Sequence, residues 1–261
     1  MPYLDRTSWR VSDVPPSRRL SVALLIAALA FLALPTSGTA QAPRRPAVSS
    51  PLAAVSRAWV EGKYDEVEAL ADKLDPRDPN VVAMKARAAI ARGKYADAEV
   101  ALRPAAMRAP TSEAALELGL LYTMLGRSDA NAVLEKIAPT ADTSNDPYEL
   151  ARAGRALRAL RRLHEANAAY REAAAMLPTD PAIQTGWGDV FLDGHNVREA
   201  LRSFQMAMQA DQRWTPALLG AARTLADENP PQAIALAKRA LEVNPSSVDA
   251  QVFLAEQALD A

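Results

Sequence analysis

The chain contains no cysteine, so it can form no disulfide, no thiolate metal site and no thiol nucleophile. Aromatic residues make up only 5% of the sequence, and no segment sustains the alternation of valine, isoleucine, threonine and aromatics that is typical of strands. The formal net charge of −1 gives no electrostatic argument for binding nucleic acid or an anionic membrane surface. Hydrophobic residues nevertheless reach 49%, and many of them are alanine, as in closely packed helices. We therefore expect an all-helical protein whose partners are not nucleic acids.

Catalytic motifs are missing as well. The segment HEANA, His164–Ala168, contains the first half of the zinc-peptidase pattern H-E-x-x-H, but Ala168 stands where the second histidine is needed on the same helix face. The only other histidine, His195, belongs to a different turn. The sequence also lacks the G-x-x-x-x-G-K-[ST] phosphate loop and the G-x-S-x-G nucleophile motif. We predict that the chain is not an enzyme and that its residues form no catalytic, metal or cofactor site.

Residues 1–42 are predicted to be a signal peptide. Arg18 and Arg19 precede an unbroken apolar run over residues 20–34. A helix of that length would be roughly 22 Å long, shorter than the ~30 Å hydrocarbon core of a bilayer. Pro35 follows the run and would end such a helix.

Small residues after the apolar run place the predicted cleavage after Ala40 or Ala42. Residues 43–50 are then a proline-rich linker. We expect a mature chain without a membrane span, exported to the periplasm or cell envelope or secreted. The alternative is a leader that is retained as an uncleaved anchor.

The rest of the chain has an internal period. Small residues recur at spacings of 33, 35, 34, 33 and 34, at Ala86, Gly119, Gly154, Gly188, Ala221 and Ala255. Alanines and prolines repeat at the same interval or at twice that interval, at Ala98, Ala166, Ala200 and Ala233 and at Pro110, Pro178 and Pro245. A single amphipathic helix cannot generate such a period, whereas stacked supersecondary units do.

The repeated residues resemble the tetratricopeptide repeat, a 34-residue unit with the pattern W-x₂-L-G-x₂-Y…A-x₃-F…P. The segments LGLLY at Leu118–Tyr122 and WGDVF at Trp187–Phe191 match its core, and Tyr170 and Phe204 each follow a repeated alanine by four residues. The resemblance covers about residues 51–261. It implies an all-α, right-handed α-solenoid of stacked antiparallel helix pairs. About six complete repeats would be followed by the first helix of a seventh, which has no second helix to pair with.

The repeated phrase GKY, at Gly62 and at Gly93, places the turns inside the repeats. Gly62, Gly93 and Gly126 each suit the left-handed position that ends a helix. We call the helix before this turn helix A and the helix after it helix B. Helix A is expected near residues 51–61, 80–92, 113–125, 147–161, 181–193, 215–227 and 248–260.

A row of arginines on the fourth helix A is the candidate binding site. Arg152, Arg155 and Arg158 lie on an arc opposite a leucine face of the same helix. In the tetratricopeptide family, helix A residues equivalent to Arg155 and Arg158 line a concave groove that takes peptides. Guanidinium groups would suit the carboxylates of an acidic segment, and Asp189 on the next helix A completes the predicted groove. The alternative is that Glu117 and Asp189 simply pair with these arginines, and the family's carboxylate clamp of Lys and Asn is not matched.

Together these features predict a protein–protein interaction scaffold of the bacterial cell envelope that binds an unidentified protein or peptide. A second hypothesis is that the chain is the N-terminal repeat region of a longer exported enzyme, for example a peptidase. The final helix A would leave Val252, Phe253, Leu254 and Leu259 partly uncovered, because a solenoid normally ends with a polar capping helix. We expect truncation of a longer chain, with a short natural C-terminus as the alternative. A third hypothesis is a structural solenoid that self-associates, for example through the uncapped C-terminal helix.

Overall fold

The computed structural model describes residues 51–259, and every regular element in that range is a helix. The predicted signal peptide and linker lie outside the described residues. The helices A are α1 Pro51–Val60, α3 Pro79–Ala91, α5 Glu113–Met124, α8 Pro147–Ala159, α10 Pro181–Asp193, α12 Thr215–Leu225 and α14 Val248–Leu259. The helices B are α2 Tyr64–Ala71, α4 Tyr95–Arg108, α6 Ala130–Leu134, α9 Leu163–Met176, α11 Val197–Ala210 and α13 Pro230–Val243, and a short helix α7 spans Thr140–Thr143.

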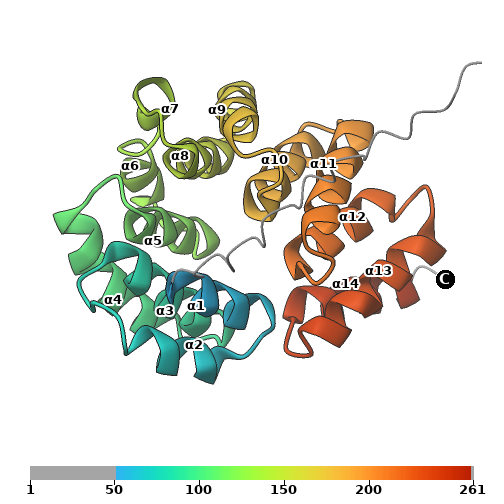
Figure 1. Cartoon of the computed structure of the whole chain (residues 1–261), viewed down its shortest axis with the longest axis horizontal. Coiled ribbons are helices and arrows are strands. Elements are labelled where there is room, and N and C mark those ends of the chain that lie inside the picture. The colour runs from blue at the N-terminus through green and yellow to red at the C-terminus, as the bar shows by residue number, and fades with distance from the viewer. Residues whose placement is uncertain (1–50, 260–261) are drawn as a thin grey trace, which may run out of the picture. The chain divides into compact units, whose positions relative to one another are not determined.

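The helices stack as antiparallel pairs, each helix A packing against its own helix B and against the next helix A. Figure 1 shows the helices A along the inner side of a curved stack and the helices B along its outer side. The all-α solenoid expected from the sequence is confirmed. Each helix A begins within one residue of its expected start and ends within two residues of its expected end.

Three of the helices A begin where an aspartate precedes a proline. Asp78, Asp146 and Asp180 are each the N-cap of a helix A whose first residue is proline. The Asp146 carboxylate, for example, accepts a hydrogen bond from the backbone N–H of Tyr148 at 2.7 Å. Proline costs nothing at this position because its missing N–H would have no helical partner.

The turns between helix A and helix B are left-handed, as predicted. Gly62, Gly93 and Gly126 have φ values of 71°, 74° and 67°. In the fourth and fifth repeats Arg161 and His195 adopt the same conformation, with φ of 62° and 59°. Five of the six turns therefore contain a left-handed residue, in two of them without a glycine, whereas the turn after α12 contains none.

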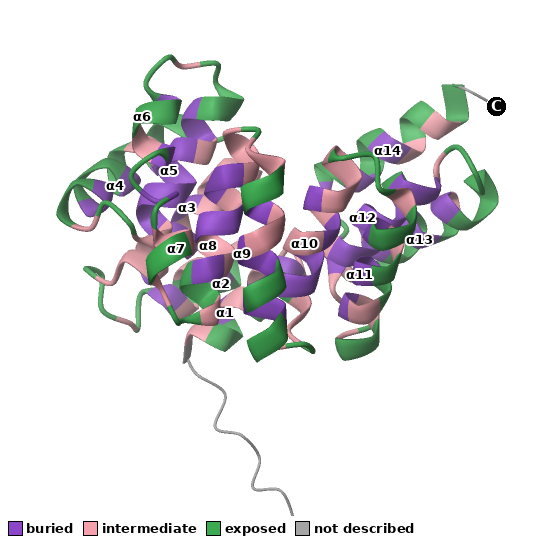
Figure 2. Cartoon of the chain, turned by 90° about the horizontal axis from the view of Figure 1, so that it is seen from above, coloured by how far each residue is buried: buried purple, intermediate pink, exposed green. Residues whose placement is uncertain are grey.

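The core is built by large side chains of helix B that pack onto small residues of helix A. Phe204 on α11 is fully buried, and it lies against Gly188 on its own helix A and Gly220 on the next. A Cβ atom at Gly188 would lie 2.7 Å from the Phe204 ring, and one at Gly220 would lie 2.3 Å from it. In Figure 2 the buried faces accordingly run between the helices along the stack, with the exposed faces outside. The periodic small residues of the sequence are thus the sites where the helices approach closely.

The third repeat departs from the regular pattern. Its helix B is reduced to α6, which is followed by turns and by the short helix α7. Leu134 and Ile137 still fill the core, both fully buried, and a Cβ at Gly119 would lie 2.5 Å from Leu134. The apolar contact with helix A is therefore retained although the helix is broken.

The two ends of the stack contact each other. The buried Thr215 hydroxyl at the start of α12 donates a hydrogen bond to the Val60 carbonyl at the end of α1, at 3.0 Å. Arg57 on α1 pairs with Asp211, and Arg213 pairs with Glu61 at 3.3 Å. Two oppositely oriented ion pairs and one buried hydrogen bond thus join the first repeat to the sixth.

We expect Gly62→Ala to destabilise the fold more than Gly93→Ala. Both glycines are left-handed, so alanine at either costs about 1–2 kcal/mol of backbone strain. At Gly93 a Cβ would meet nothing within 4 Å, whereas at Gly62 it would lie 2.0 Å from Oδ1 of Asn244, a buried side chain near the other end of the stack. Urea denaturation of the two variants measures the difference, with Gly126→Ala as a second open-space control. Equal losses at Gly62 and Gly93 would contradict the contact between the ends.

The final helix A is more covered than the sequence suggests. Phe253 is buried, with 6% of its surface exposed, because it packs into the core formed with α12 and α13. The expectation that Phe253 would be partly uncovered is therefore wrong. Val252 and Leu259 are exposed as expected, at 49% and 87%. Within the described range, no helix has the length and hydropathy needed to cross a membrane.

Candidate functional site

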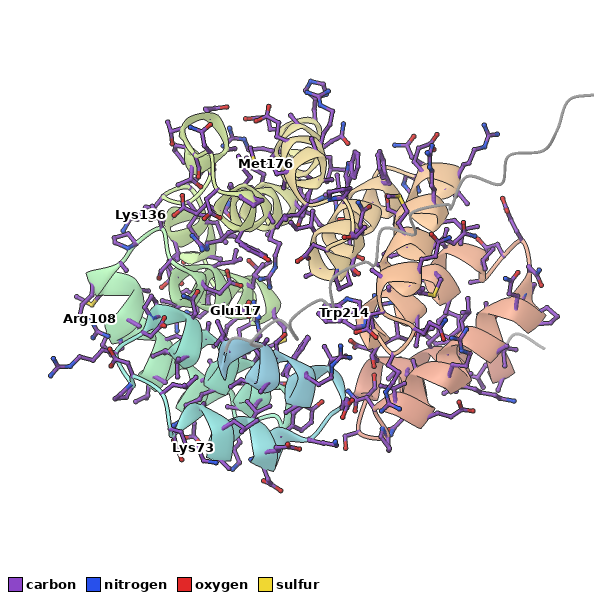
Figure 3. All side chains as sticks on the ribbon, viewed as in Figure 1. Lys73, Arg108, Glu117, Lys136, Met176 and Trp214 are labelled. Atoms are coloured by element: carbon purple, nitrogen blue, oxygen red, sulfur yellow. The ribbon has the colours of Figure 1, made fainter. Side chains whose placement is uncertain are left out.

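The inner surface of the stack carries the densest set of charged side chains, contributed by four successive helices A. Figure 3 labels Glu117 and Trp214 on this inner side, while Lys73, Arg108, Lys136 and Met176 lie on the outer side. Because adjacent helices A lie side by side, charges about 30 residues apart in the sequence become neighbours. These charges form two groups.

The first group, which we call the Arg–Glu cluster, joins three helices. It consists of Arg87 on α3, Glu113 and Glu117 on α5, and Arg152 and Arg155 on α8. Three guanidinium groups against two carboxylates leave the cluster with a net charge of +1. The two glutamates lie one helical turn apart, where they would repel each other without the arginines on either side.

Hydrogen bonds within the Arg–Glu cluster are short and charge-assisted. Arg87 donates from Nε and Nη2 to Glu117 Oε1 at 2.9 and 2.7 Å, and it also pairs with Glu113. Arg155 bridges both glutamates, at 2.6 Å to Glu113 and 2.7 Å to Glu117. Arg152 donates to Glu113 at 3.2 Å and to the Thr111 carbonyl at 3.1 Å. Such geometry makes the cluster a rigid cross-link between the second, third and fourth repeats.

The cluster sits largely out of water, which sets the protonation of its carboxyl groups. Burial by itself raises the pKa of Glu113, but the facing Arg87, Arg155 and Arg152 outweigh it and lower that pKa to about 2. The pKa of Glu117, whose residue is 5% exposed, is lowered for the same reason, mainly by Arg87 and Arg155 against the opposing effect of burial. Burial by itself lowers the pKa of Arg155, but the two glutamates raise it by more, so the pKa of Arg155 lies above its ordinary value. Glu113, Glu117 and Arg155 are therefore charged at neutral pH.

The second group, the Arg–Asp cluster, lies between the fourth and fifth repeats. Arg158 on α8 donates to Asp189 at 3.1 Å and to both oxygens of Asp193 at 3.0 and 3.2 Å. Arg161, in the turn, pairs with Asp193 at 3.2 Å. The Arg158 side chain is 35% exposed, and burial raises the pKa of Asp189 despite the nearby guanidinium. This cluster is more open to solvent than the Arg–Glu cluster.

The structure places all four sequence-predicted site residues on this surface, but it pairs them with one another or with neighbours. Arg155 contacts Glu117 and Arg158 contacts Asp189, which are the two pairings that the sequence presented as the alternative to partner binding. Arg152 is 14% exposed at its side chain and contacts Glu113, a pairing that the sequence did not indicate.

Arg87, Glu113 and Asp193 complete the two clusters and were not singled out from the sequence. Arg87 also stacks on the Trp59 ring of α1, with its guanidinium carbon 5.9 Å from the ring centroid. In the sequence, these residues could have been found only as opposite charges about one repeat period away, on the preceding or following helix A. Such spacing predicts that two helices are neighbours. It does not predict how each helix is rotated about its axis, which decides which side chains meet.

Comparisons with known proteins agree with this architecture. Residues 83–146 match the family model described as Tetratricopeptide repeat. The chain is also similar to a solved structure titled "Crystal structure of APC/C hetero-tetramer Cut9-Hcn1", with 18% sequence identity and a TM-score of 0.50. That match covers 79% of this chain and 42% of the other, so this chain spans less than half of the length of the protein it matches. The search of curated proteins found no match. The likeness to the solved structure shows the fold alone.

The chemistry of the inner surface is that of ion pairing. Among the described residues, no group of three or more histidine, aspartate or glutamate side chains is arranged to hold a metal ion. The carboxylates of both clusters face guanidinium groups, which already neutralise them. The described side chains of this surface thus satisfy one another's charges across neighbouring helices A.

The free energy of unfolding is expected to fall as the pH drops from about 5 to 2. The pKa of Glu113 is about 2 in the folded chain against an ordinary value of 4.5. The contribution of Glu113 to the free energy of unfolding is therefore fully present above pH 4.5 and is lost as the pH falls toward 2. That shift corresponds to about 3 kcal/mol. Glu113→Gln should be less stable at pH 7 and should show a shallower pH dependence in this window. Chemical denaturation at several pH values measures both, with the exposed Glu66→Gln as control. Parallel pH profiles for Glu113→Gln and the unmodified chain would contradict the assignment.

Proposed function

We propose that the chain is a protein-interaction scaffold, exported to the bacterial cell envelope, that holds an acidic segment of a partner on its inner surface. Stacked tetratricopeptide-like helix pairs generally serve protein–protein interaction. The observation that carries the proposal is the Arg–Asp cluster, where Arg158 is about one-third exposed and meets two aspartates through three hydrogen bonds. A partner carboxylate can replace Asp193 there, because Asp193 stays paired with Arg161 in the turn.

The energetics favour exchange at Arg158 over exchange at Arg155. Partly exposed ion pairs contribute only ~0–1 kcal/mol, so replacing one carboxylate by another at Arg158 costs little. The Arg155 side chain is about as exposed as that of Arg158, at 33% against 35%. Its partners Glu113 and Glu117, however, are more buried than the two aspartates and are fixed by three guanidinium groups. We therefore propose that the partner carboxylate binds at Arg158 in place of Asp193, with Arg155, Arg152 and Asp189 beside it.

The test compares Arg158→Glu with Arg108→Glu. Both substitutions change the net charge equally, but Arg158 lies in the Arg–Asp cluster and the exposed Arg108 lies on the outer side (Figure 3). The tagged chain is used to capture proteins from an envelope extract, and the captured proteins are identified and quantified by mass spectrometry. We expect Arg158→Glu to lose the captured partner and Arg108→Glu to retain it, with melting temperatures that show both variants folded. Capture that is unchanged in a folded Arg158→Glu chain would refute this site.

Export has a separate test. The predicted leader at residues 1–42 supports an envelope location, since its apolar run is short and is followed by small residues at the cleavage positions. N-terminal sequencing of the chain recovered from the periplasm should begin directly after Ala40 or Ala42. Recovery of the intact N-terminus in a membrane fraction would instead support an uncleaved anchor.

A further inference from the structure

The contact between the two ends of the stack is polar. We call its residues the end junction: Arg57, Val60, Glu61 and Gly62 on one side, and Asp211, Arg213, Thr215 and Asn244 on the other. Val60, Thr215 and Asn244 are buried there. The apolar clusters that flank the junction each stay on their own side, one within residues 52–88 and the other within residues 191–254. Charges and hydrogen bonds therefore hold the ends together, and separating the ends would split neither cluster.

The four charges of the end junction differ in their exposure to solvent. The side chains of Arg57 and Arg213 are 44% and 61% exposed, whereas those of Asp211 and Glu61 are 16% and 13% exposed. A ligand in solution therefore reaches the guanidinium groups more readily than the carboxylates. Ion pairs with an exposed member contribute little individually and are screened by salt. An anionic ligand can thus compete for the two arginines.

The two carboxylates keep a partner when the ends separate, and the two arginines do not. Glu61 also pairs with Lys63, two residues further along the same turn, at 2.7 Å. Asp211 also accepts a hydrogen bond from the Arg213 backbone N–H at 2.8 Å. Within residues 51–259, the guanidinium groups of Arg57 and Arg213 have ion pairs only across the junction. Opening would leave these two groups unpaired, so a ligand that carries carboxylates would bind the open form more tightly than the closed form.

We propose that the end junction is a latch that an acidic segment of a partner protein opens, with carboxylates of that segment binding Arg57 and Arg213 in the open form. A basic segment is disfavoured, because Glu61 and Asp211 are largely buried and each has a partner on its own side. Without a ligand the open form is expected to be a minor population of about 0.1–10%. This site is separate from Arg158 and does not depend on the function proposed for it.

The first test follows the distance across the junction. Spin labels are attached at Lys73→Cys in the first repeat and Lys238→Cys on α13, two exposed positions in a chain that has no other cysteine. Double electron–electron resonance measures the label distance at about 0.1 M salt, where charges are screened beyond about 10 Å. We expect a short distance for the chain alone and a longer distance after a decaglutamate peptide is added, whereas a decalysine peptide should leave the short distance. No shift with decaglutamate, or the same shift with decalysine, would overturn the proposal.

Arg57→Gln/Arg213→Gln and Arg108→Gln/Arg171→Gln provide the matched pair of variants. Each removes two exposed arginines, but Arg108 and Arg171 lie on the helices B α4 and α9. Arg57→Gln/Arg213→Gln should show the longer distance without peptide and should bind labelled decaglutamate at least about tenfold more weakly, while the control should change binding less than about twofold. Equal affinities of the two variants would refute the proposal. Circular dichroism should show the same helix content for both, and a loss of helix in the junction variant would also refute a latch.

Arg158→Glu separates this test from that of the inner surface. Both measurements are repeated in this background, because the function proposed above gives decaglutamate a second site at Arg158. The distance shift and the tenfold difference in affinity should persist there. If they persist while capture by Arg158→Glu is also unchanged, the latch is supported and the inner-surface site is refuted. If the shift disappears in Arg158→Glu, the peptide acts from the inner surface and the latch proposal is wrong.

Discussion

Replacing Glu117 by leucine is expected to lower the free energy of unfolding by about 3 kcal/mol, because it leaves two guanidinium groups of a largely buried cluster without their shared carboxylate. The Glu117 side chain is 7% exposed, and it accepts hydrogen bonds from Arg87 and Arg155 on the two neighbouring helices A. Leucine fills a similar volume but accepts no hydrogen bond. Arg87 and Arg155 would then share only Glu113, with three arginines on one carboxylate. Urea denaturation at pH 7 measures the loss.

Two further variants show that charge pairing is the cause. Glu117→Gln keeps an acceptor and the side-chain shape but removes the charge, so we expect an intermediate loss. A triple variant with Glu117→Leu, Arg87→Met and Arg155→Met removes the unpaired cations together with the carboxylate, and it should recover most of the stability lost by Glu117→Leu alone. A loss below about 1 kcal/mol for Glu117→Leu would mean that the cluster behaves as an ordinary exposed ion pair.

Phe204→Ala is expected to destabilise the chain by about 3–5 kcal/mol, the usual cost of truncating a fully buried phenylalanine. Phe204 has no exposed surface, and its ring fills the space between α10 and α12 over Gly188 and Gly220. Neither glycine has a side chain that could move into the space left by the ring. The cavity would therefore remain largely open, which places the expected loss toward the upper part of the range.

A double-mutant cycle with Gly188 makes this prediction specific. In the unmodified chain Gly188→Ala should destabilise, because the added Cβ would lie 2.7 Å from the Phe204 ring. In the Phe204→Ala background the same substitution should stabilise, by up to about 1 kcal/mol, because alanine is favoured over glycine inside a helix once the ring is gone. The melting temperatures of the four chains give the sign of each step. An effect of Gly188→Ala with the same sign in both backgrounds would contradict the packing of Phe204 on Gly188.

The period of small residues and prolines in the sequence determines most of the architecture. Ala86, Gly119, Gly154 and Gly188 mark the close approaches between helices, and the glycine turns mark where helix A ends. These features are local or strictly repeated, so their physical requirements are visible in the sequence. A left-handed turn needs a residue that tolerates positive φ, and a close contact needs a small side chain. The helix ranges were accordingly predicted to within two residues.

Tertiary structure decided the features that depend on helix rotation and on contacts between distant repeats. The arginines of α8 could be placed on one face from the sequence, but their partners Glu113 and Asp193 could not be chosen among the many carboxylates present. The contact of Thr215 with the Val60 carbonyl was equally hidden, because small rotations between successive repeats add up before the ends meet. The sequence therefore determined the repeat and its helices, because a left-handed turn or a close helix contact depends on only a few residues. The ion pairs of the inner surface and the contact between the ends follow from the accumulated geometry of six stacked pairs, which no single repeat contains.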